Sequence, residues 1–269
     1  MDKKYLRILE EGGFYYNDDG SIRLSGLAFE LYNSLISYIS ETLKPFYNES
    51  LHVSPIIKKN ILNKTGYIDN FPQHLIKFNG KLVNLKDCFL TPAACFHIYP
   101  LLKNASINKD KGYLVLSQCG RYEDGKWDSP FRLSSFTMLE VVVFGSEEYI
   151  EKARNEVLLI LKKLFTKINL KGDFYTATDA FYIDNNSGAK VLQKIKELKK
   201  EYRVKFDNDD IALMSINKHE KYFSNRFNIL LDSKENAESM CIAFGLERLV
   251  AMGLLKWGAD KSKWAKELR

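Results

Sequence analysis

The sequence contains few cysteines and few prolines, and it has no long apolar run. Its four cysteines, spread over 269 residues, are too few and too scattered for a disulfide framework, so they are core thiols or metal ligands. No stretch reaches the ~18 consecutive apolar residues that a membrane-spanning helix needs. Acidic residues stand near the N-terminus, where a secretory signal requires an apolar run. We therefore expect a cytoplasmic protein without a membrane partner.

The scarcity of proline also bears on domain organisation. Only six prolines are present, and they do not gather with glycine or serine into a linker. The sequence has no internal repeat, and its 45% apolar residues suffice for a substantial core. We expect one compact domain over residues 1–269. The net charge of +6 favours an acidic partner without requiring one, because lysines commonly lie on solvated faces.

Apolar spacing predicts two long helices and a pair of strands. Leu27, Leu31, Leu35 and Ile39 recur every four residues, which predicts a helix over residues 27–43. Ser146 suits an N-cap, because acidic residues and then helically spaced apolar residues follow it. Between these helices, residues 112–123 and 138–144 are rich in branched and apolar side chains, which predicts two strands joined by a polar loop.

Shorter patterns complete the expected architecture. A helix is predicted after Pro55, ending at Gly66, and a strand over residues 226–231 precedes a turn at Gly245 that opens another helix. Residues 187–202 also predict a helix, with its lysines mostly pointing outward. Strands follow strands here rather than alternating strictly with helices, which favours an α+β fold with an antiparallel sheet flanked by helices.

Three segments, in chain order, resemble the signature motifs of class II aminoacyl-tRNA synthetases. Motif 1 resembles VSPIIKKNILNKTGYIDNFP, which in that family contributes to a homodimer interface. Motif 2 resembles CGRYE, a loop, and the returning strand RLSSFTMLEVVVFG. Motif 3 resembles AFGLERL, except that Ala243 replaces the first glycine of the family pattern. The resemblance implies a class II synthetase-like antiparallel sheet and an ATP site.

A narrower resemblance is to the amino acid:[carrier protein] ligases, which are truncated relatives of the atypical zinc-dependent seryl-tRNA synthetases. The segments LTPAACFHIYP, FYTATDAFY, SINKHEKYF and SMCIAFGLERL are each similar to a stretch of that family. The resemblance implies activation of a small amino acid as an aminoacyl-adenylate. It further implies transfer to the phosphopantetheine thiol of an acidic carrier protein. Because no segment is left over for a tRNA-reading domain, we expect no tRNA partner.

The resemblance assigns an ATP site to motifs 2 and 3. Arg121 and Arg248 are the expected catalytic residues, since fixed guanidinium donors can hold phosphate oxygens and an incoming carboxylate. Glu123 would accept a hydrogen bond from the adenine amino group, Phe136 would stack on the ring, and Arg132 would reach the terminal phosphates. Mg²⁺ would accompany the leaving pyrophosphate. Four of these residues also have a purely structural alternative. Arg121 could be a surface arginine and Glu123 a solvated acid. Phe136 could belong to the core, and Arg248 could pair with a nearby acid on its helix.

The family also implies a zinc ion on Cys95, Glu140 and Cys241, with one position open for the substrate amino group. Separations of 45 and 101 residues indicate nothing by themselves, and scattered cysteines are more often core thiols. However, Glu140 lies within the apolar segment LEVVVF, where an ionised carboxylate is costly unless it is paired or bound to metal. We therefore expect a zinc site.

The remaining expectations concern the amino acid and the acceptor. Asp179 and His219 are candidates for the amino-acid pocket, although His219 could equally be a structural histidine. Lys190, Lys194 and Lys199, on the predicted helix 187–202, are candidates for docking the acidic carrier through charge complementarity. Two alternatives stay open: transfer of the activated group to tRNA or to a metabolite amine, and a catalytically silent relative that binds an amino acid or a partner protein.

Overall fold

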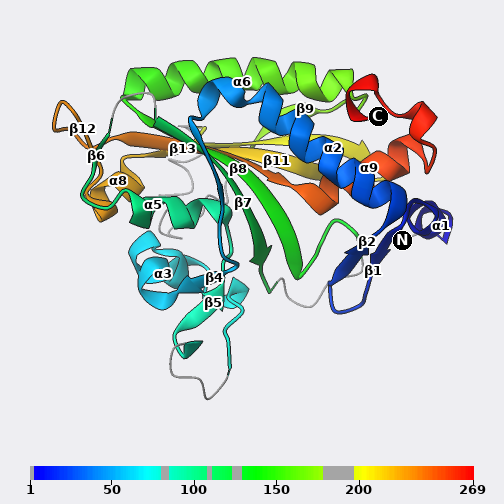
Figure 1. Cartoon of the computed structure of the whole chain (residues 1–269), viewed down its shortest axis with the longest axis horizontal. Coiled ribbons are helices and arrows are strands. Elements are labelled where there is room, and N and C mark those ends of the chain that lie inside the picture. Colours follow the sequence, from blue (N-terminus) through cyan, green and yellow to red (C-terminus); the bar gives the residue numbers. More distant parts are fainter. Residues whose placement is uncertain (1–2, 80–84, 108–110, 123–128, 178–196) are drawn as a thin grey trace.

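The structure, a computed structural model, describes residues 3–79, 85–107, 111–122, 129–177 and 197–269, and its centre is a seven-stranded sheet (Figure 1). Across the sheet the strands are β3 (Glu49–His52), β7 (Lys111–Gly120), β8 (Ser135–Gly145), β13 (Glu238–Gly245), β11 (Asp209–Glu220), β10 (Lys199–Phe206) and β9 (Asp173–Ala177). Every neighbouring pair is antiparallel except β3 with β7. The α+β class and the antiparallel sheet are confirmed.

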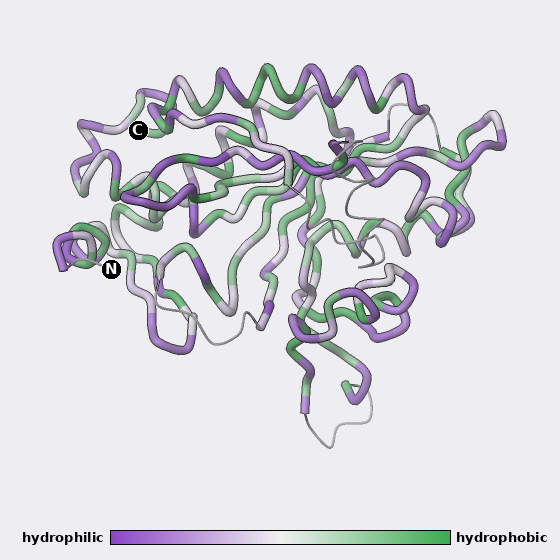
Figure 2. The backbone as a smooth tube through the Cα atoms, turned by 180° about the vertical axis from the view of Figure 1, so that it is seen from behind, coloured by the Kyte–Doolittle hydropathy of each residue, from purple (hydrophilic) through white to green (hydrophobic). Residues whose placement is uncertain are grey.

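One face of this sheet is covered by long helices. They are α2 (Gly26–Thr42), α6 (Glu147–Lys167) and α9 (Leu246–Trp257), with α1 (Lys3–Gly12) and the hairpin of β1 (Phe14–Tyr16) and β2 (Ile22–Leu24) beside them (Figure 1). The helix predicted after Ser146 is confirmed, and the Ser146 side chain accepts a hydrogen bond from the Tyr149 backbone N–H. Figure 2 shows hydrophobic and hydrophilic stretches alternating along α6, because the apolar residues of each turn face the sheet.

A smaller lobe of short elements packs on the opposite face of the sheet. It consists of β4 (Ile56–Lys58), α3 (Lys59–Thr65), α4 (Tyr67–Asn70), β5 (Cys88–Leu90), α5 (Ile98–Leu101), β6 (Ser106–Ile107), α8 (Tyr222–Phe227) and β12 (Leu230–Leu231). The 3₁₀ turns η2 (Pro72–His74) and η4 (Ala94–His97) belong to it, whereas η1 (Lys44–Phe46), η5 (Lys261–Lys263) and η6 (Lys266–Leu268) lie elsewhere.

Strand β8 illustrates how the sequence builds two cores. Leu139, Val141 and Val143 pack with the long helices, whereas Met138 and Val142 pack with the small lobe. Successive side chains of a strand point to opposite faces, so a continuous apolar run serves a sheet that is covered on both sides.

Several predicted elements were wrong. Pro55 precedes the short strand β4 rather than a helix, so the helix that ends at Gly66 begins only at Lys59. Residues 226–231 end helix α8 and contain the two-residue strand β12, and residues 199–202 belong to strand β10 rather than to a lysine-rich helix. Residues 187–196 lie outside the described part of the chain. Among the described residues, no helix is long and apolar enough to cross a membrane.

Candidate active site and metal centre

A cavity of about 300 Å³ lies between the sheet and the small lobe. Strand register determines which side chains face it. Ala243 pairs with Glu140 on one side and with Ser215 on the other, and Ser215 pairs in turn with Glu201. The neighbouring row runs from Cys241 through Asn217 to Lys199. These two rows form the sheet-side wall of the cavity.

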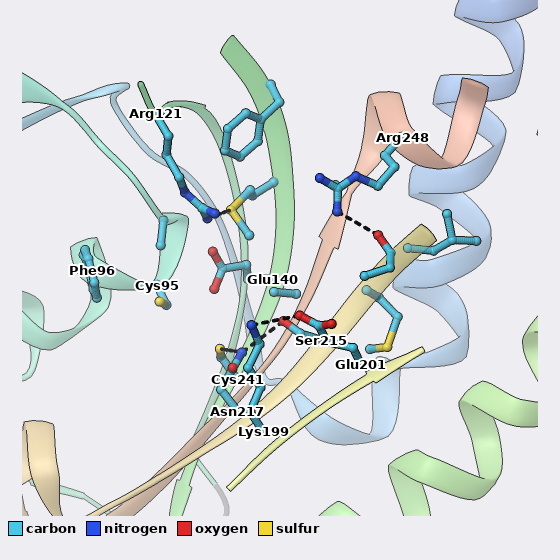
Figure 3. Close-up of a pocket in the computed structure, with 18 of the residues that line it drawn as sticks. Cys95, Phe96, Arg121, Glu140, Lys199, Glu201, Ser215, Asn217, Cys241 and Arg248 are labelled. Carbon is cyan, nitrogen blue, oxygen red and sulfur yellow. Dashed lines mark hydrogen bonds and ion pairs between the residues drawn. The ribbon is translucent and has the colours of Figure 1, made fainter. Parts of the chain in front are cut away.

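The predicted zinc ligands come together at one end of this wall. Atoms of Cys95, Glu140 and Cys241 that could bind a metal all lie within 4.8 Å of one another. Glu140 and Cys241 project from adjacent strands, whereas Cys95 comes from turn η4 of the small lobe. The Ala94 backbone N–H donates to Glu140 Oε1 at 2.7 Å, which orients the carboxylate toward the two thiols. Figure 3 shows the three side chains converging on one side of the cavity.

The electrostatics of this triad fit a cation. The hydrogen bond with Cys241, burial and the neighbouring Glu140 charge raise the pKa of the Cys95 thiol well above its usual value. Burial also raises the pKa of Glu140, against the hydrogen bonds that it accepts from Cys95 and Ala94. A divalent metal ion stabilises the deprotonated forms of such groups. Two sulfur donors and one carboxylate, all less than 5% exposed, suit a zinc site with three protein ligands.

Arg121 and Phe136 form one wall of the cavity at the ends of β7 and β8. The Arg121 Nε donates to the Pro92 carbonyl at 2.8 Å, and its guanidinium carbon lies 5.1 Å from the centre of the Phe136 ring. The guanidinium also contacts Met138 Sδ at 3.6 Å. These contacts fix the planar group, so its remaining donors have a defined direction relative to a ligand.

Arg248 faces Arg121 from the other side. It lies in the first turn of α9. Its Nε donates to the Phe131 carbonyl at 3.0 Å, and its Nη1 donates to the Ala212 carbonyl at 2.7 Å. Figure 3 shows the two guanidinium groups pointing toward each other across the cavity. The structure thus brings the two motif arginines and Phe136 to a single site.

Glu247, one residue before Arg248, joins α9 to β8. Its carboxylate is 3% exposed and accepts a 2.7 Å hydrogen bond from the backbone N–H of Thr137, the residue after Phe136. Burial raises the pKa of Glu247. The contact fixes the position of Arg248 relative to Phe136, although both are held by other bonds as well.

His219 lines the cavity deep in the wall. Its Nδ1 lies 3.0 Å from the Tyr99 hydroxyl and 3.3 Å from the Ser239 hydroxyl. Burial lowers the pKa of His219 to about 3, so the ring is neutral at physiological pH. Its pocket position agrees with the prediction, and its hydrogen bonds agree with the structural alternative. A contact between His219 and the amino acid stays a prediction.

Lys199 corrects a prediction. It was expected on an outward helix face, but it projects from β10 into the cavity wall, is 4% exposed and forms a 2.8 Å ion pair with Glu201. A lysine so buried cannot form part of a docking surface.

Arg132 is exposed and does not line the cavity, although Phe131 and Leu133 on either side of it do. Glu123, Asp179, Lys190 and Lys194 lie outside the described residues.

The cavity is also lined by residues that were not predicted as site residues, among them Ser215, Asn217, Glu201 and Glu247. Two of them had a recognisable signal. Ser215, Asn217 and His219 alternate along SINKHE, and a period of two is typical of a strand face. Glu201 had none, because the surrounding lysines made the segment similar to a solvated helix.

Comparisons with known proteins place this site in context. No family model matches the chain. It is 25% identical over 268 residues to amino acid–[acyl-carrier-protein] ligase 1 of Bradyrhizobium diazoefficiens, covering 89% of this chain and 82% of the relative. It is also 25% identical over 219 residues to the type-2 serine–tRNA ligase of Methanococcus aeolicus, covering 78% of this chain but only 41% of that relative.

Solved structures agree on the fold. The seryl-tRNA synthetase of M. kandleri, in complex with A. aeolicus tRNASec, superposes with a TM-score of 0.82 at 17% identity, covering 99% of this chain and 59% of that one. The seryl-tRNA synthetase of Pyrococcus horikoshii, complexed with ATP, gives 0.73 at 14% identity, covering 92% of this chain and 57% of that one. The chain is therefore a relative of the amino acid–[acyl-carrier-protein] ligases and the type-2 serine–tRNA ligases, built on the class II aminoacyl-tRNA synthetase catalytic fold.

Proposed function

We propose that this protein activates a small amino acid with ATP and transfers it to the phosphopantetheine thiol of an acidic carrier protein. The observation that supports this function most directly is the convergence of Arg121, Arg248 and the Cys95–Glu140–Cys241 triad on one cavity. The named ligase relatives, which this chain matches over most of their length, support the carrier as acceptor.

The first step joins the amino acid to AMP. A carboxylate oxygen of the amino acid forms a bond to the α-phosphorus of ATP, and the bond from that phosphorus to pyrophosphate breaks. Negative charge develops on the phosphate oxygens, so fixed cationic donors lower the barrier. Arg121 would hold the α-phosphate and the incoming carboxylate, Arg248 would hold the terminal phosphates, and Phe136 would stack on adenine. Mg²⁺ would leave with the pyrophosphate.

The amino acid requires a second point of attachment. Cys95, Glu140 and Cys241 would hold zinc, which, when bound, supplies a Lewis acid with one open position for an uncharged amine. With its amino group held there, the amino acid would present its carboxylate to Arg121. This arrangement would favour amino acids over plain carboxylic acids.

In the second step a thiolate attacks the carbonyl carbon of the aminoacyl-adenylate, a thioester forms and AMP leaves. An incoming phosphopantetheine provides the nucleophile, so the enzyme needs none of its own.

Lys190 and Lys194 stay candidates for carrier docking. A homodimer, a single domain without a tRNA-reading module and a cytoplasmic location also stay predictions. Transfer to tRNA or to a metabolite amine is the alternative for the acceptor, and amino-acid binding without turnover is the alternative to catalysis.

Amino-acid-dependent exchange of labelled pyrophosphate into ATP tests activation, and it should be run with all twenty amino acids before and after zinc removal. We expect exchange with one or a few amino acids that is lost on chelation and restored by zinc. Incubation of an adenylate made from labelled amino acid with holo-carrier, apo-carrier or tRNA then separates the acceptors. Label on the apo-carrier as well as the holo-carrier, or on tRNA, would contradict thioester transfer. Tight amino-acid binding without exchange would favour the silent alternative.

A further inference from the structure

The wall beyond the metal triad is unusually polar for a buried surface. Four polar side chains lie on two adjacent strands, Lys199 and Glu201 on β10 and Ser215 and Asn217 on β11. We call these four residues the polar row. The register Lys199↔Asn217 and Glu201↔Ser215 places them side by side on the cavity face. Because Asn217 pairs with Cys241 on the next strand, the row begins directly beside a metal-ligand candidate.

The ion pair in this row is held at its carboxylate end by a second cation. Lys199 Nζ lies 2.8 Å from Glu201 Oε1, with side chains only 5% and 13% exposed, and Arg203 donates to Glu201 Oε2 at 2.7 and 3.0 Å. Removing two charges from water is costly, and apolar residues of similar volume often replace such a pair without loss of stability. The pair is therefore not explained by stability alone, and its place in the cavity wall suggests a ligand.

Asn217 adds an acceptor to the row. Its amide nitrogen donates to Ser215 Oγ at 3.1 Å and to Cys241 Sγ at 3.4 Å. Its Oδ1 is buried and, among the described residues, has no hydrogen-bond partner, although the residue is only 2% exposed. A buried acceptor without a donor costs free energy, so this oxygen is suited to receive a hydrogen from a bound ligand.

Donors stand next to this acceptor. An ammonium has three N–H donors, and the Ser215 hydroxyl can donate or accept. A side chain bound here should therefore both give and receive a hydrogen bond. Aliphatic side chains do neither, a carboxylate cannot donate to Asn217 Oδ1, and an ammonium would meet Lys199.

We propose that the polar row is the side-chain subsite of the amino-acid pocket and that it selects an amino acid whose side chain ends in a neutral hydroxyl or carboxamide. This inference rests on the proposed function and narrows its substrate. Discrimination would come from the buried polar groups, because an apolar substrate would cover them without replacing their hydrogen bonds to water.

The test compares isosteric amino acids in pyrophosphate exchange by the wild-type protein. Serine is paired with 2-aminobutyrate, asparagine with leucine and with aspartate, and glycine and alanine are included. We expect at least one polar member to exceed its apolar isostere by about 100-fold or more in kcat/KM, as in sites built to hydrogen-bond a substrate group. Equal or faster exchange with glycine, alanine or the apolar isosteres would overturn the subsite and leave the activating function intact. No exchange with any amino acid would overturn both.

A double variant tests the residues themselves. Lys199→Met with Glu201→Leu removes both charges and keeps approximate side-chain volume, so the polar-to-apolar ratio should fall by at least about tenfold. Lys205→Met, on the same strand but exposed, is the matched control and should keep the wild-type ratio. Thermal unfolding of each variant establishes that it folds. An unchanged ratio in a folded double variant would overturn the role of the pair.

Discussion

The backbone N–H of Ala94 donates a 2.7 Å hydrogen bond to Glu140, a residue of β8 that is 46 positions further along the chain. This bond attaches turn η4 of the small lobe to the central sheet at the point where Cys95 meets Cys241. The metal-ligand candidates thus come from two parts of the fold, turn η4 and the central sheet, and this hydrogen bond joins the two beside the site. A site prepared in this way should bind metal without large rearrangement.

The first prediction concerns metal content. Cys241→Ser should reduce bound zinc from about one equivalent to near zero at moderate chelator concentration, because one thiolate ligand is lost. Elemental analysis and competition with a chromogenic chelator would measure this directly, without reference to activity. Cys119→Ser is the matched control, since Cys119 is equally buried but lies outside the triad. Equal zinc content in both variants would exclude the site.

The second prediction concerns Arg121. Arg121→Ala should lower amino-acid-dependent pyrophosphate exchange by at least about 100-fold, because the variant loses a fixed donor for the developing phosphate charge. Arg121→Lys should recover little, since an ammonium cannot keep the bond to Pro92 and present a planar fork to the ligand. Arg7→Ala, at an exposed helix position, is the control. Exchange within threefold of wild type in Arg121→Ala would contradict the assignment.

How much of this site follows from sequence differs from residue to residue. The α6 helix was predictable because Ser146, the acidic first turn and the helical period all agree. Lys199 was not, because it lies near the end of the lysine-rich residues 187–202, whose apolar spacing predicted a helix. The alternation of Tyr202, Val204 and Phe206 that is typical of a strand begins only after it, so the start of β10 at Lys199 follows from pairing with β9 and β11.

The triad shows a second limit. Cys95, Glu140 and Cys241 are brought together by sheet register and by one turn, and neither can be deduced from separations along the chain. Only the resemblance to a known family suggested them. The polar row had no such help. Asn217 stands in the alternating segment SINKHE, which is typical of a strand face, whereas Glu201 emerged from the geometry alone.

The third prediction concerns pH. Burial lowers the pKa of His219 from its usual 6.5 to about 3, so the folded protein leaves the ring neutral while the unfolded chain protonates it below pH 6.5. His219 therefore lowers the free energy of unfolding as the pH falls, by about 2 kcal/mol between pH 7 and pH 5. His219→Asn should remove this part of the acid sensitivity.

Urea unfolding at the two pH values would measure the effect. Every other titratable group is the same in both proteins, so the difference between wild type and variant isolates the contribution of His219. His52→Asn, exposed on β3, provides the control and should keep the wild-type slope. The same loss of stability on acidification in His219→Asn as in wild type would show that burial does not keep this ring neutral.

The last prediction concerns Glu247, which connects the two halves of the nucleotide site. Its carboxylate holds the Thr137 N–H beside Phe136, while the next residue, Arg248, faces the same cavity. Glu247→Ala would leave that N–H unpaired, which should cost about 1–3 kcal/mol of unfolding free energy and loosen the spacing between ring and guanidinium. Glu247→Gln keeps an acceptor at the same position, so it should restore most of the stability.

Kinetics separates this positioning role from a purely structural one. If Glu247 fixes the adenine site, the alanine variant should raise the KM for ATP. The KM for the amino acid should stay near the wild-type value, because Glu247 bonds to Thr137 and not to the metal triad or the polar row. Glu247→Gln should return the KM for ATP toward wild type. Parallel increases in both constants, or a fully active alanine variant with reduced stability, would mean that Glu247 supports the fold and does not set the geometry of the nucleotide site.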